Sequence, residues 1–103
     1  MDVRLLYFDD CPSWRVAEER LRTALDATGH PDVPIVRERV TTIDEARQRH
    51  FCGSPTILVN GVDPFATAHD EPALACRVYA SDQGREGSPS VAQLTHAVAE
   101  ATH

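Results

Sequence analysis

Apolar and polar positions along the first half of the chain predict alternating strands and helices. The run VRLLYF at 3–8 is apolar and rich in strand formers, so it predicts a buried strand. From Pro12, apolar residues recur every three or four positions with charged residues between them, which predicts a helix that ends at Gly29. A second strand is expected over 33–40.

A short second helix is expected over 43–50, because Thr42 can act as its N-cap and Glu45 completes a capping box. After this helix, the apolar runs become shorter and turn residues become frequent. The remaining elements are predicted as a loop at 51–54, a strand at 56–59, a turn at Asn60–Gly61, a strand at 74–79, a loop at 84–87, and a last helix capped by Ser88 or Ser90.

The resulting order β-α-β-α-β-β-α predicts a single α/β domain over residues 1–103. Its alternating first half requires a parallel strand pair, and its second half suits a hairpin. The expected architecture is a mixed four-stranded sheet flanked by helices.

Composition and charge narrow the possible partners. The net charge is −6, and the ten basic residues are all scattered arginines without a basic stripe. We therefore expect no nucleic-acid binding and no docking on anionic lipid. No apolar segment reaches membrane-spanning length and no signal peptide is evident, which predicts a cytoplasmic location with reduced thiols. The sequence contains no phosphate-binding glycine loop, and no cofactor is expected.

Cys11 is the main candidate for chemistry, since it lies at the predicted start of the first helix. The positive end of the helix dipole favours a thiolate, which is the reactive form of cysteine. Asp9 and Asp10 oppose this effect with negative charge. The alternative interpretation is that Cys11 is a buried packing residue.

Two motifs resemble those of the thioredoxin superfamily. Cys11-Pro12-Ser13-Trp14 directly follows the first predicted strand, and Gly53-Ser54-Pro55-Thr56 directly precedes the third. This resemblance implies a thioredoxin-like fold in which Pro55 is cis and faces Cys11. The chain is also similar to small bacterial members of the superfamily with a GSPT-I-x-V-N-G segment, some of which are associated with resistance to mercury or other thiophilic metals.

The chain departs from the dithiol motif, because Trp14 stands where a second cysteine would lie. The resemblance places Cys52 beside Cys11, as a resolving thiol or, with His50, as a soft-metal ligand; otherwise Cys52 is an incidental loop cysteine. Cys76 alternates with apolar neighbours and is interpreted as a core cysteine. The residues expected to contact a substrate are Pro12, Trp14, Ser54 and Pro55, although Trp14 also fits a packing role.

Three functions remain open. The first is a monothiol redox protein, possibly a thiol–disulfide oxidoreductase, in which Cys11 exchanges with a protein or small-molecule thiol or disulfide, such as glutathione, and Cys52 resolves the product. The second is binding of Hg(II) or Cu(I) by Cys11, Cys52 and His50 for detoxification. The third is a thioredoxin-like interaction module without catalysis.

Overall fold

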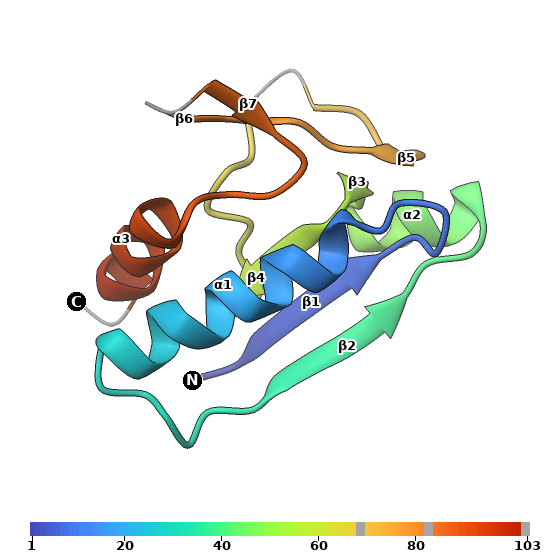
Figure 1. Ribbon diagram of the computed structural model, residues 1–103. Coiled ribbons are helices and arrows are strands. Elements are labelled where there is room, and N and C mark those ends of the chain that lie inside the picture. The colour runs from blue at the N-terminus through green and yellow to red at the C-terminus, as the bar shows by residue number, and fades with distance from the viewer. Residues whose placement is uncertain (68–69, 82–83, 102–103) are drawn as a thin grey trace.

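The computed structural model describes residues 1–67, 70–81 and 84–101 (Figure 1). These residues form a small mixed α/β domain. In chain order its elements are β1 (Val3–Tyr7), α1 (Ser13–Ala27), β2 (Ile35–Arg39), α2 (Ile43–Arg49), β3 (Cys52–Ser54), β4 (Thr56–Val59), β5 (Ala73–Cys76), β6 (Tyr79–Ser81), β7 (Gly84–Glu86) and α3 (Val91–Ala101).

The main sheet has the strand order β2-β1-β4. Strand β1 is parallel to β2, with Val3 opposite Ile35, and antiparallel to β4, with Val3 opposite Val59. The parallel β1-α1-β2 unit therefore forms as the alternating sequence pattern predicted.

In the described ranges the main sheet has three strands and not the expected four. The fourth strand was expected at 74–79, but that segment is divided into β5 and β6, and neither pairs with the main sheet in the described part of the chain. After the Asn60–Gly61 turn the described residues form only a single bridge between Val59 and Val62, and Pro64, which has no N–H, follows it. The other paired strands form two small separate sheets, β3 with β5 and β6 with β7.

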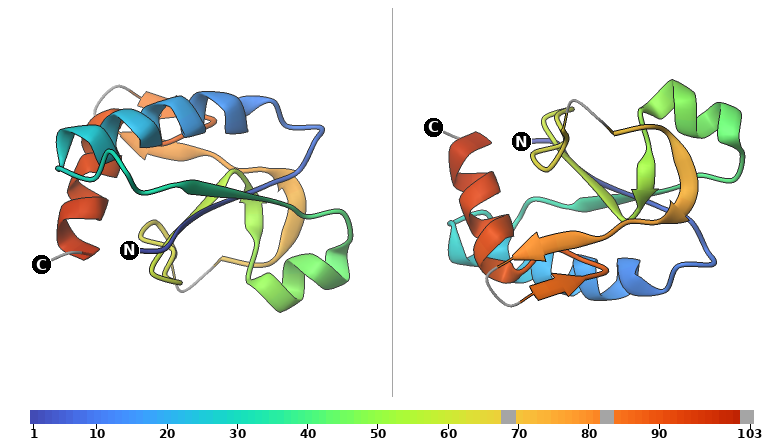
Figure 2. Two further views of the ribbon diagram at one scale, coloured as in Figure 1. Left: turned by 90° about the horizontal axis from the view of Figure 1, so that it is seen from below. Right: turned by 90° about the horizontal axis from the view of Figure 1, so that it is seen from above.

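Helices cover both faces of the main sheet, and α1 and α2 lie on opposite sides (Figure 2). On the α1 side, the helices α1 and α3 pack together over the larger core. Its buried members are Val3, Leu5, Ala17, Leu21, Ala24, Leu25, Ile57, Val59, Leu94 and Val98. On the α2 side lies a smaller core of Leu6, Val40, Ala46 and Phe51. No helix in the described ranges has the length and apolar character needed to span a bilayer.

The predicted helix caps are present. The Thr42 hydroxyl accepts a hydrogen bond from the Glu45 amide, and the Glu45 carboxylate accepts one from the Thr41 amide. At α3, Ser90 and Gln93 exchange two such bonds. Both pairs satisfy N–H groups that have no partner inside the helix.

Three local predictions in the second half were wrong. The expected loop at 51–54 contains β3, the expected strand at 74–79 is divided into β5 and β6, and the expected loop at 84–87 contains β7. Each of these strands has only three or four residues. Segments this short are too brief to show a clear strand period in the sequence.

Candidate functional site

Cys11 and Cys76 form a disulfide, although 65 positions separate them in the sequence. Their Cα atoms are 5.6 Å apart, within the normal range for such bonds. Cys11 is 2% exposed and directly precedes Pro12, the N-cap of α1. Its amide donates to the Phe8 carbonyl at 3.0 Å, which turns the chain from β1 into the helix. The predicted position of Cys11 at a helix start is therefore confirmed.

Cys76 reaches Cys11 because β5 pairs with β3. Cys76 ends β5 opposite Ser54, and the next residue, Arg77, donates its amide to the Ser54 carbonyl at 2.9 Å. The Ser54 hydroxyl accepts a bond from the Phe8 amide at 2.9 Å. Ser54 thus contacts both segments that carry the bonded cysteines. The Ser54–Pro55 peptide bond is cis, as the resemblance implied.

The two bonded cysteines differ in accessibility. Cys11 is buried under the start of α1, whereas Cys76 is exposed at the end of its short strand. Of the two bonded residues, only Cys76 is therefore exposed to solvent.

The segment that follows Cys76 is anchored by a buried ion pair. The Arg77 guanidinium lies 2.7 Å from the Asp63 carboxylate, and these side chains are only 9% and 11% exposed. Arg77 also donates to the Phe65 carbonyl at 2.9 Å. Burial lowers the pKa of Arg77, but the Asp63 hydrogen bond and nearby negative charge outweigh it, so the net pKa is raised and the guanidinium stays charged.

Tyr79 adds a second anchor two residues further along. Its hydroxyl donates to the Pro55 carbonyl, and its ring meets Phe65 edge to face at 5.3 Å between centroids. The Arg77 guanidinium carbon lies 4.8 Å from the centre of the Tyr79 ring. Burial raises the pKa of Tyr79 above its ordinary value, so the hydroxyl remains a neutral donor.

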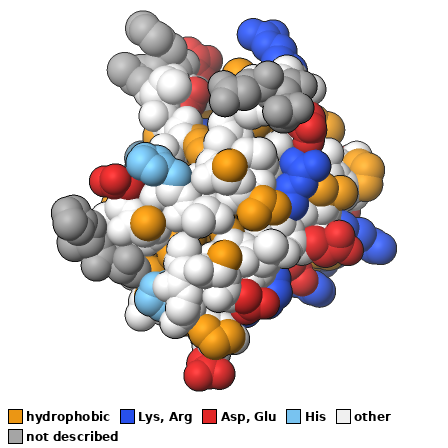
Figure 3. All heavy atoms as spheres, turned by 60° about the vertical axis from the view of Figure 1, so that its left-hand side comes forward, with side chains coloured by type: hydrophobic (Ala, Val, Ile, Leu, Met, Phe, Trp, Pro, Cys, Tyr) orange, Lys and Arg blue, Asp and Glu red, His pale blue; other side chains and the backbone are white. Residues whose placement is uncertain are grey.

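Most other ion pairs among the described residues are at the surface. On the face in Figure 3, acidic and basic side chains are interspersed. The pairs Arg39–Asp9 and Arg47–Asp44, for example, have side chains more than half exposed. Exposed pairs of this kind contribute little to stability, because water and salt screen them. The Arg77–Asp63 pair differs because removal of one partner leaves the other charge buried.

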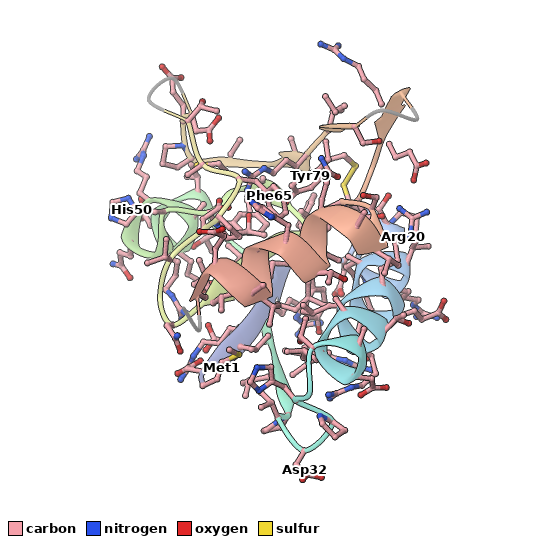
Figure 4. The ribbon with its side chains drawn as sticks, turned by 90° about the vertical axis from the view of Figure 1, so that its left-hand side faces the viewer. Met1, Arg20, Asp32, His50, Phe65 and Tyr79 are labelled. Carbon is pink, nitrogen blue, oxygen red and sulfur yellow. A yellow bond between two sulfur atoms is a disulfide. The ribbon has the colours of Figure 1, made fainter. Side chains whose placement is uncertain are left out.

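Cys52 does not pair with Cys11. Its thiol donates to the His50 carbonyl at 3.5 Å, and in β3 it lies opposite Ala73, three residues before Cys76. That offset corresponds to about 10 Å along a strand. In Figure 4, His50 lies far from the disulfide beside Tyr79. The hypothesised Cys11–Cys52 pairing is thus replaced by Cys11–Cys76, and the described part of the chain holds no cluster of three or more metal-ligating side chains.

The predicted substrate contacts lie near the disulfide but differ in accessibility. Pro12 is exposed, while Ser54 and Pro55 are buried. The carbonyl of Ser54, which a bound chain could have used, already accepts from Arg77. The edge beside Pro55 is therefore occupied by the protein's own strand.

Trp14 has the packing role proposed for it, and its substrate role stays a prediction. It packs against the larger core and stacks on Tyr7 with 4.5 Å between ring centroids. The guanidinium groups of Arg15 and Arg37 each lie 5.2 Å from the centre of its ring. Partial exposure leaves the indole beside Cys11 as both a packing residue and a candidate contact.

Sequence reasoning missed Cys76 as a partner of Cys11. Its alternation with Leu74 and Val78 indicated a common buried face, but β5 ends at Cys76 and Val78 is 60% exposed. No signal in the sequence near Cys76 identifies Cys11 as its partner.

Cys52 is expected to be a slow nucleophile. Burial and the charges of Asp70 and Asp63 raise the pKa of its thiol, and Arg77 opposes them only in part. Less thiolate is then present at neutral pH than in an ordinary thiol. In the oxidised protein, Cys52 should react with iodoacetamide more slowly than glutathione does, and its rate should still rise with pH after that of glutathione levels off. A rate at neutral pH equal to that of glutathione would contradict this prediction.

Comparison with known proteins identifies no relative: no family model, curated protein or solved structure matches this chain.

Proposed function

We propose that this protein carries out thiol–disulfide exchange through the Cys11–Cys76 pair. The observation that carries the proposal is a disulfide between a buried cysteine at a helix start and an exposed cysteine on a neighbouring strand. The first position favours a thiolate, and the second gives access to an external sulfur. Cys76 thereby replaces Cys52 as the resolving partner in the original redox hypothesis.

The exchange proceeds in two balanced steps. A thiolate from a small-molecule or protein thiol attacks the Cys76 sulfur; a mixed disulfide forms, and the electron pair of the broken bond passes to the Cys11 sulfur. A second external thiolate then attacks the external sulfur of that mixed disulfide. The products are an external disulfide and the Cys76 thiolate, so two external thiols are oxidised as the protein disulfide is reduced.

Cys11 is suited to be the leaving group in the first step. Exchange is faster when the departing thiolate is stable. Cys11 lies beside the first turn of α1, where unpaired N–H groups and the helix dipole favour negative charge, whereas its burial and the Asp9 and Asp10 carboxylates oppose it. The reverse reaction oxidises the pair with a substrate disulfide.

A thioredoxin-like fold and a cytoplasmic location are part of the same proposal. Support for the fold comes from the parallel β1-α1-β2 unit, the antiparallel β4 beside β1, and the Ser54–Pro55 turn next to the Cys11 segment. Support for the location comes from the odd number of cysteines, with Cys52 left free, which is unlike a secreted disulfide framework. Cytosolic disulfides are usually transient and catalytic.

The test is equilibration of the protein with mixtures of reduced and oxidised glutathione, followed by acid quenching, alkylation and peptide mapping. We expect the Cys11–Cys76 bond to open and close reversibly while Cys52 stays a free thiol. Reduced wild type and Cys52→Ser should reduce a model disulfide with excess glutathione, whereas Cys11→Ser and Cys76→Ser should fall to the background rate. A native disulfide that resists excess glutathione would overturn the proposal and indicate a structural bond.

Soft-metal binding remains a second candidate, now at a different pair. After reduction, the adjacent thiols of Cys11 and Cys76 would offer two sulfur ligands of the kind that Cu(I) prefers. Titration of reduced protein with Cu(I) against a competing chelator tests it. Binding that Cys76→Ser removes and Cys52→Ser retains would support this function; affinity equal to that of a simple dithiol would exclude it.

A further inference from the structure

We infer that Arg77, held by Asp63, is a positioning residue that keeps Cys76 opposite Cys11 while both thiols are reduced. This inference rests on the proposed exchange function. In a protein without a second cysteine on α1, some other element must hold the partner thiol in reach. The structure assigns that task to the segment immediately after Cys76.

Arg77 is held to the rest of the molecule through both its backbone and its side chain. Its amide holds the Ser54 carbonyl, and its side chain binds Asp63 and the Phe65 carbonyl. These contacts involve only groups outside the disulfide, so reduction of the disulfide removes none of them. The ion pair is shielded from water and therefore weakly screened by salt.

Contacts before Cys76 complete the support. The Ala73 amide donates to the Phe51 carbonyl at 3.0 Å, and Leu74 packs against the smaller core. Cys76 is therefore held from both sides, although it is itself exposed. A thiol fixed in this way has a high effective concentration toward Cys11, because closing the bond requires little further ordering of the chain.

This role predicts a change in redox equilibrium and not only in stability. A substitution that lowers the stability of the oxidised and reduced proteins equally leaves the equilibrium with glutathione unchanged. Arg77→Met should instead free the Cys76 segment in the reduced protein alone, since the disulfide still holds it in the oxidised protein. Forming the disulfide must then order the Cys76 segment again, which costs conformational entropy.

The experiment measures the equilibrium constant of the Cys11–Cys76 pair against glutathione for wild type, Arg77→Met, Arg77→Lys and Asp63→Asn. We expect Arg77→Met to disfavour the disulfide by about tenfold or more, equivalent to about 30 mV for this two-electron couple. Arg77→Lys should have an intermediate effect, because lysine keeps the charge but lacks the fork that reaches two acceptors. Asp63→Asn should shift the constant in the same direction as Arg77→Met.

Arg22 provides a matched control. It also combines one carboxylate, Asp26, with backbone carbonyls such as that of Val33, but it lies in the middle of α1. Arg22→Met should leave the constant unchanged. If wild type shows no reversible equilibrium, the proposed function fails. If wild type equilibrates and both Arg77→Met and Asp63→Asn match it, the function stands and the positioning role is overturned. Should Arg77→Met not fold, Arg77→Lys and Asp63→Asn decide the question.

Discussion

Reduction of the Cys11–Cys76 disulfide is expected to lower the free energy of unfolding by about 4 kcal/mol. The bond joins residues 65 positions apart, so it closes a large loop in the unfolded chain. Closing that loop removes conformational entropy from the unfolded state and leaves the folded chain unchanged. For a domain of this size, about 4 kcal/mol is a large part of the total stability.

Urea unfolding with and without a strong reductant measures this difference, and Trp14, the single tryptophan, reports the transition by fluorescence. The Cys52→Ser variant should show the same loss as wild type. A Cys11→Ser/Cys76→Ser variant should have the lower stability in both conditions. Equal stability of oxidised and reduced wild type would show that the bond does not constrain the unfolded chain as expected.

The same free energy links stability to redox chemistry. If the disulfide stabilises the fold by about 4 kcal/mol, folding must favour the disulfide by the same amount, which is about a thousandfold in the equilibrium with glutathione. A partial loss of order in the Cys76 segment of the reduced protein lowers this preference for the disulfide. The Arg77 variants therefore test how much of the link passes through one anchoring residue.

The sequence predicted elements whose stabilising pattern is local. The apolar stripe of α1 and the Thr42 cap of α2 are both visible within a few residues, and both are present in the structure. The third strand of the main sheet, Thr56–Val59, was predicted for the same reason. Local periodicity was sufficient wherever an element packs one face on the core.

The candidate site was only partly predictable, because it depends on a contact between distant segments. Cys11 could be selected from its place before Pro12, but nothing near Cys76 distinguishes it from a packing cysteine. The pairing of β3 with β5 creates the contact, and β3 contains only Cys52, Gly53 and Ser54. A strand of three residues that includes glycine has almost no strand signal of its own.

Gly53→Ala is expected to destabilise the protein by about 2–5 kcal/mol and to disfavour the disulfide as well. Gly53 has φ +119°, where a side chain strains the backbone. An added Cβ would also lie 2.9 Å from the Cβ of Arg77 and 3.2 Å from the carbonyl oxygen of Ala75. Because these atoms flank Cys76, the substitution should force β5 away from β3.

Gly61→Ala separates the two causes. Gly61 also has a positive φ, +81°, but an added Cβ there would meet no atom within 4 Å. The Gly61→Ala variant should lose about 1–2 kcal/mol of stability from backbone strain alone and keep the wild-type equilibrium with glutathione. If Gly53→Ala loses no more stability than Gly61→Ala and retains the same redox equilibrium, close packing of β3 on β5 is not what brings Cys76 to Cys11. A larger loss in both measurements would show that one missing side chain at Gly53 allows the exposed cysteine to reach the buried one.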